Sequence, residues 1–110
     1  MAYDEDLANR IRELVYPDES VTEKRMFGGL AFLVNGNMAV AASREGGILL
    51  RIDPEHTDKL RAARHAAPFE MRGRAMDGWL RVAEDGLRTR RELARWVERG
   101  VSYARSLPGK

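Results

Sequence analysis

The sequence predicts an α+β domain with one antiparallel sheet, in the order α-β-β-β-α-β-β-α. Apolar residues recur at helical spacing near both ends of the chain, and short apolar runs separated by glycine-containing turns occupy its middle. The chain has 110 residues, of which 44% are hydrophobic and 33% charged. That size and composition are typical of one globular domain that folds alone. We therefore expect a single domain over residues 1–110.

The first expected element is an amphipathic helix over residues 5–15. Asp4 stands where an N-cap carboxylate would accept a backbone N–H. Pro17 ends the helix, because its ring disfavours the helical conformation for the preceding residue. The apolar side chains share one helical face, at i, i+4, i+7 and i+8: Leu7, Ile11, Leu14 and Val15.

A three-stranded antiparallel meander is expected next. Apolar runs at 30–34 and 38–42 flank Asn35-Gly36, a pair that supplies the positive φ angles of a tight hairpin turn. A second turn at 44–47 leads to the third run, 48–52. The runs are apolar at successive positions, whereas a sheet with one solvent-exposed face would alternate. We therefore expect helices or a second subunit to cover both faces, which favours a homodimer.

The second half of the chain predicts a helix, two strands and a last helix. Asp53 and Pro54 open a helix of about ten residues, which ends before Pro68. Residues 69–82 predict a short strand, a loop and a stronger strand at 78–82. The last helix begins at Thr89, which forms a capping box with the glutamate three residues later.

Composition and motifs exclude several kinds of site. The chain has no cysteine, which rules out disulfides and thiolate sites and favours the cytoplasm. Its N-terminus is acidic, and no apolar run approaches the roughly 18 residues that span a membrane. His56 and His65 would lie on opposite sides of one helix, so they would not share a metal. We expect no cofactor, metal, catalytic residue or membrane association.

One candidate interaction surface lies between Met71 and Trp79. Methionine adapts to varied partners, and tryptophan and arginine anchor protein interfaces. The alternative is that Met76 and Trp79 complete the core, with Trp79 packed against Trp96. The candidate residues are Arg72, Arg74, Met76 and Trp79.

A second candidate surface is basic. Basic residues outnumber acidic ones in the second half of the chain, and three arginines recur at i, i+4 and i+8 on one face of the last helix. These could contact phosphates of a nucleic acid; the alternative is a solvated outer face, interrupted by Glu92 and Glu98. The candidate residues are Arg91, Arg95 and Arg99.

Four groups of residues follow one another in a recognisable order. They are Met26-Phe27-Gly28-Gly29-Leu30-Ala31-Phe32, Asn35-Gly36-Asn37-Met38, Arg51, and Gly73-Arg74-Ala75-Met76-Asp77-Gly78-Trp79. Together they resemble the N-terminal domain of the TfoX (Sxy) family over nearly the whole chain. The resemblance implies a secretion-chaperone-like fold and no catalytic residue. Ala75 departs from the proline that we would expect in many free-standing relatives.

The resemblance also implies a regulatory role. Two-domain members of the family regulate natural competence in bacteria, acting with the cyclic-AMP receptor protein at promoters of DNA-uptake genes. The 110 residues correspond to the N-terminal domain alone. We therefore expect a non-enzymatic regulatory module that binds an unidentified protein. One alternative is a nucleic-acid-binding protein that uses the basic C-terminal half. Another is a small-molecule-binding domain or enzyme with a pocket between sheet and helices, where Arg25, Arg51 or Arg81 holds an anion.

Overall fold

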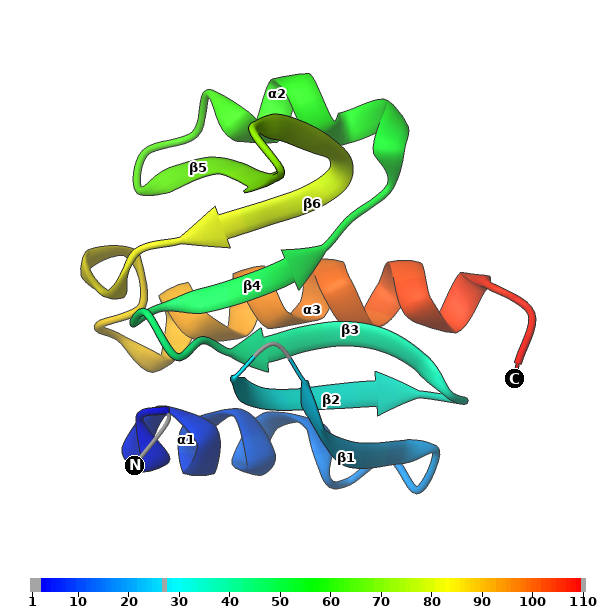
Figure 1. Ribbon diagram of the computed structural model, residues 1–110. Coiled ribbons are helices and arrows are strands. Elements are labelled where there is room, and N and C mark those ends of the chain that lie inside the picture. Colours follow the sequence, from blue (N-terminus) through cyan, green and yellow to red (C-terminus); the bar gives the residue numbers. More distant parts are fainter. Residues whose placement is uncertain (1–2, 27, 110) are drawn as a thin grey trace.

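The computed structural model describes residues 3–26 and 28–109, which form a sheet with helices packed on one of its faces (Figure 1). Every neighbouring pair of strands is antiparallel, in the spatial order β1-β2-β3-β4-β6-β5. The strands are β1 (Val21–Met26), β2 (Gly29–Val34), β3 (Asn37–Ala42), β4 (Ile48–Arg51), β5 (Ala66–Met71) and β6 (Arg74–Val82). The helices are α1 (Glu5–Val15), α2 (Thr57–Arg61) and α3 (Arg90–Ser106), with short 3₁₀ turns η1 (Pro54–His56) and η2 (Glu84–Gly86).

The predicted α+β class with one antiparallel sheet is confirmed. The expected order holds for the predicted strands, and β1 precedes them at one edge of the sheet. Strand β1 was not predicted because it carries few apolar residues. As an edge strand it has exposed positions that polar side chains can occupy. Among the helices of the described ranges, none is long and apolar enough to cross a lipid bilayer.

Local sequence signals are confirmed at three element boundaries. The Asp4 carboxylate accepts the Leu7 backbone N–H at 3.2 Å and caps α1. Asn35 and Gly36 have φ angles of 52° and 84°, as the hairpin turn requires. The Thr89–Glu92 capping box is complete, with both of its bonds at 3.1 Å.

The region after β4 differs from the prediction. The expected ten-residue helix is a 3₁₀ turn followed by the short helix α2, which ends at Arg61. His65 has a φ of 71° and follows the helix, so the two histidines do not share one helix as predicted. Strand β5 begins directly afterwards and contains Pro68, which an edge strand tolerates because it pairs on one side only. The residues expected to form a loop continue β6 instead.

The helices and the sheet share the main core. Phe32, Leu50 and Leu80 from three strands are almost fully buried beneath α1 and α3. Strand β3 contains one extra residue, Ala39, so that Ala39 and Val40 both belong to this core. Helix α3 approaches that bulge at Gly100, where a Cβ atom would lie 2.5 Å from the Ala39 carbonyl oxygen.

The opposite face of the sheet, called the open face below, carries a second apolar cluster. Its centre consists of Ala31, Met38, Ala41 and Leu49, each at most 5% exposed. In the part of the chain that the structure describes, the residues packed on this cluster come from the strands themselves: Met26, Leu33, Phe69 and Trp79. Helices therefore cover one face rather than both, and the strands' own larger side chains cover the other. The homodimer stays a prediction.

Asp18 fastens the turn after α1 to the end of α3. Its carboxylate accepts the Ser20 hydroxyl at 2.6 Å and the Ser20 backbone N–H at 2.9 Å, and it pairs with Arg105. The Ser20 hydroxyl, the Ser20 backbone and Arg105 lower the pKa of Asp18 from 3.8 to about 2. Folding therefore favours the charged form of this carboxyl group.

The Asp18→Asn variant should show a shallower loss of stability in acid than the native chain. Because the pKa of Asp18 is lower in the folded state, its contribution is present above about pH 4 and is lost as the pH falls toward about 2. Urea unfolding across that range measures the slope of the unfolding free energy against pH. Ser20→Ala removes the hydroxyl group that lowers the pKa of Asp18 most and should give an intermediate slope. Equal slopes for all three chains would contradict this role of Asp18.

Candidate functional site

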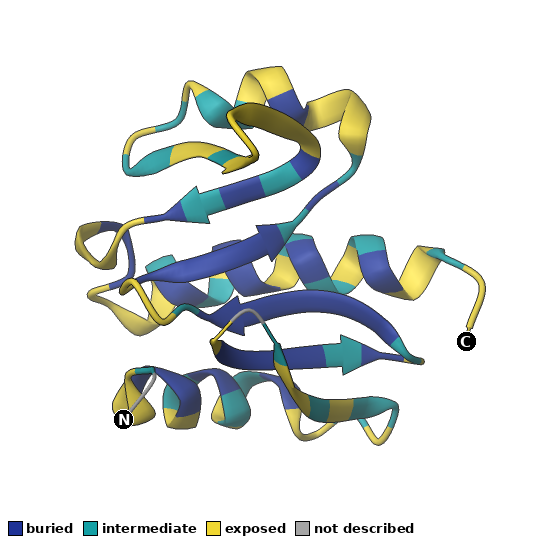
Figure 2. Ribbon diagram, viewed as in Figure 1, coloured by how far each residue is buried: buried dark blue, intermediate teal, exposed yellow. Residues whose placement is uncertain are grey.

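The turn between β5 and β6 presents the first predicted surface. Arg72 and Gly73 form the turn, with φ angles of 53° and 77°. Among the described residues, three large apolar side chains are exposed, and two of these are Met71 (44%) and Met76 (36%). Figure 2 shows this end of the hairpin as largely exposed. The structure thus gathers four exposed side chains, called the hairpin tip below: Met71, Arg72, Arg74 and Met76.

Trp79 does not belong to the hairpin tip. Gly78, with a φ of 85°, separates it from Met76, and Trp79 lies half-buried on the open face. Its ring centroid lies 6.2 Å from that of Phe69, and the Arg51 guanidinium lies 5.6 Å from the Trp79 ring. Trp96 belongs to the core on the other face of the sheet. The alternative in which Trp79 packs against Trp96 is therefore wrong.

The predicted arginine stripe on α3 is divided between two environments. Arg91 and Arg95 are exposed and Arg99 is half-buried; Arg95 and Arg99, but not Arg91, line a groove between α3 and the η1–α2 segment. The Arg99 guanidinium lies 4.7 Å from the centre of the Trp96 ring, which packs beneath it. The three arginines therefore do not act as one equally exposed row.

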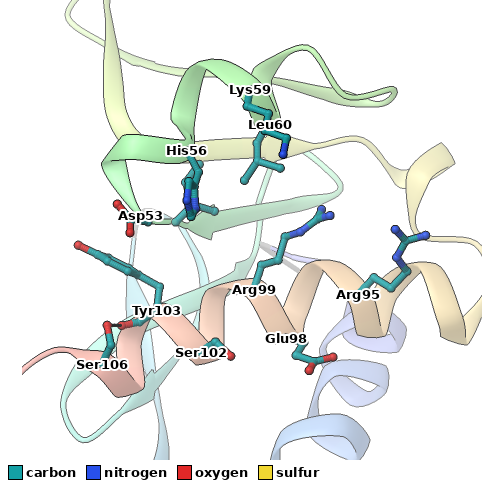
Figure 3. Close-up of a pocket in the computed structure, with 11 residues that line it drawn as sticks. Asp53, His56, Lys59, Leu60, Arg95, Glu98, Arg99, Ser102, Tyr103 and Ser106 are labelled. Carbon is teal, nitrogen blue, oxygen red and sulfur yellow. Dashed lines mark hydrogen bonds between the residues drawn. The ribbon is translucent and has the colours of Figure 1, made fainter.

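This hollow, called the α2–α3 groove below, has a volume of about 650 Å³. Figure 3 shows Arg95 and Arg99 reaching from α3 toward α2, while Lys59 reaches back from α2 and His56 from η1. Glu98 points away from α2, and the Asp53 carboxylate accepts the Glu55 backbone N–H at 2.9 Å. The basic side chains thus point into the space between α2 and α3, whereas Glu98 points away from α2 and Asp53 caps η1.

The α2 side of the groove was missed in the sequence. On α3, the spacing of Arg95, Arg99, Ser102 and Ser106 places them on one helical face. The predicted arginine stripe included the first two of these residues. Lys59 has no such signal, because only the packing of α2 beside α3 brings it near the arginines. The arginines proposed to hold an anion, Arg25, Arg51 and Arg81, do not line this groove. Arg81 instead pairs with Glu45.

Comparison with protein families gives one match. The model of the TfoX N-terminal domain matches residues 13–104, from within α1 to within α3. The chain belongs to this family. No curated protein and no solved structure matches the chain. The matched range of this TfoX N-terminal domain includes every strand of the sheet, the hairpin tip and most of the α2–α3 groove.

Proposed function

We propose that this TfoX N-terminal domain is a non-enzymatic regulatory module that binds another protein through the hairpin tip. The exposure of Met71 and Met76 at a turn that also exposes two arginines carries the proposal. Burial of apolar surface provides binding energy, about 25 cal/mol per Å², and arginine adds bidentate contacts to carboxylates. Family membership supports a competence-regulator-like role.

The geometry favours this function over binding of a nucleic acid along α3. A phosphate-binding row needs several cationic groups that face the same strand of nucleic acid. Arg99 is turned onto Trp96 inside the groove, while Arg91 is exposed near the start of the helix. Glu92 and Glu98 interrupt the same helix. The hairpin tip combines two exposed methionines with two exposed arginines, which supports the protein-binding proposal.

Site-specific photocrosslinking tests the protein-binding function. A photoreactive amino acid is placed at position 71 or 76, the chain is expressed in cells, and the crosslinked products are identified by mass spectrometry. We expect one protein to be captured from both positions. The charge reversals Arg72→Glu and Arg74→Glu, made together, should abolish its capture. A photoreactive residue at the exposed position Glu5 on α1 is the matched control and should not capture it.

Three outcomes would contradict the proposal. Capture that is equal from position 5 would show that the contact is nonspecific. Capture that persists after the charge reversals would show that the arginines do not contribute. A crosslink to a second copy of the chain would replace the proposed partner by a homodimer.

A further inference from the structure

Three basic side chains, Lys59, Arg95 and Arg99, line the α2–α3 groove and outnumber its two carboxylates, Asp53 and Glu98. Within residues 3–26 and 28–109, Lys59, Arg95 and Arg99 form no ion pair, although ion pairs occupy Arg12, Arg61, Arg81 and Arg105 elsewhere. Like charges that a fold holds near one another repel, and the repulsion is strongest where water is partly excluded. An anion in the groove would relieve that repulsion.

The basic side chains come from two elements and face one another. Arg95 and Arg99 stand one turn apart on α3, and Lys59 approaches from α2 on the other side (Figure 3). Trp96 supports the Arg99 guanidinium at 4.7 Å, a cation–π contact that restricts the side chain. A ligand would therefore meet at least one cation that is already oriented.

The groove also has apolar and aromatic lining residues, beside polar ones. Ile52 is buried, and Leu60 and Tyr103 are half-buried along the groove. The hydroxyl groups of Ser102 and Ser106 lie on the α3 side. A volume of about 650 Å³ falls within the range of small-molecule sites, roughly 300–1,000 Å³. A ligand with both an anionic group and a flat apolar part would use the whole groove.

We propose that the α2–α3 groove binds a small organic phosphate. Three basic side chains match a phosphate monoester, which carries close to two negative charges at neutral pH, better than they match a single carboxylate. The guanidinium forks of Arg95 and Arg99 fit the tetrahedral phosphate oxygens. The apolar part of the ligand lies against Leu60 and Tyr103. This site is separate from the hairpin tip, so it stands or falls independently of the proposed protein binding.

Phenyl phosphate is a suitable probe, because it combines a dianionic phosphate with an aromatic ring. The chain has two tryptophans, so the Trp79→Phe variant reports only on Trp96, which lies beneath Arg99. Titration should change the Trp96 fluorescence saturably, with a dissociation constant of about 1 mM or lower. Benzoate and inorganic phosphate should each bind at least about tenfold more weakly, since each lacks one of the two features.

Substitutions in the same background locate the site. Arg95→Gln and Arg99→Gln should each weaken phenyl phosphate binding by about tenfold or more, because each removes a charge-assisted hydrogen bond. Arg91→Gln is the matched control on the same helix, outside the groove, and should change the affinity less than about twofold. Circular dichroism verifies that each variant is folded. If loss of the Arg99–Trp96 contact disturbs the helix, the affinity of the Arg95→Gln variant still tests the site, because Arg95 is exposed.

Several results would overturn the proposal. The absence of a saturable change would show that the groove binds no aromatic phosphate. If inorganic phosphate binds as tightly as phenyl phosphate, the groove does not contact the organic part of the ligand. An equal loss of affinity in Arg91→Gln would assign binding to the general charge of α3. Tight binding of duplex DNA, with an affinity that depends equally on Arg91, Arg95 and Arg99, would indicate that the ligand is a nucleic acid and not a small phosphate.

Discussion

Replacing Gly100 by alanine should lower the free energy of unfolding by about 2–3 kcal/mol. The added Cβ would lie 2.5 Å from the Ala39 carbonyl oxygen and 2.7 Å from Cδ1 of Leu50. The carbonyl belongs to the β3 backbone, so α3 would have to move away from the sheet. This cost outweighs the better helix propensity of alanine, about 1 kcal/mol. Urea unfolding followed by circular dichroism measures the difference.

Ser102→Ala is the matched control for this prediction. Ser102 lies two residues further along α3 and is exposed, so its replacement should change stability by less than about 0.5 kcal/mol. Increased stability of the Gly100→Ala variant would contradict the close approach of α3 to the bulge in β3.

The Thr57→Val substitution should lower the free energy of unfolding by about 2–3 kcal/mol, although the two side chains have nearly the same shape. Thr57 is 1% exposed. Its hydroxyl donates to the Pro54 carbonyl oxygen and accepts the Gly78 backbone N–H, both at 2.8 Å. Valine would leave that N–H without its partner in a buried position. Urea unfolding gives the stability change, and hydrogen exchange of the Gly78 amide should accelerate.

Thr57→Ser separates the hydroxyl from the methyl group. Serine keeps both hydrogen bonds and loses one methyl group, so it should lower the free energy of unfolding by about 1 kcal/mol. We therefore expect serine to be tolerated better than valine. The reverse order would show that packing of the methyl group, rather than the bond to Gly78, holds α2 against β6.

The fold follows from the sequence wherever a local pattern decides the structure. The Asp4 cap, the Asn35-Gly36 turn and the Thr89–Glu92 capping box each depend on residues within a few positions of one another. Apolar periodicity likewise predicts α1 and α3, because one face of each helix meets the core. Such signals need no knowledge of the rest of the chain.

Features that depend on distant packing escape the same reasoning. Strand β1 is recognisable only from its pairing with β2, since its residues are mostly polar. Trp79 and Trp96 are both large and apolar, and their sequence does not indicate that they lie on opposite faces of the sheet. The α2–α3 groove exists because a short helix packs beside α3. Lys59 therefore joins Arg95 and Arg99 only in the folded chain.

The two edges of the sheet limit how the domain can associate. Strand β1 places Lys24 and Arg25 at one edge, and β5 places Pro68, which lacks an N–H, at the other. Charged side chains and proline at an edge both discourage a strand of another chain from extending the sheet. These residues are therefore expected to disfavour edge-to-edge association of the domain. We therefore expect a partner protein to contact side chains rather than to add a strand to the sheet.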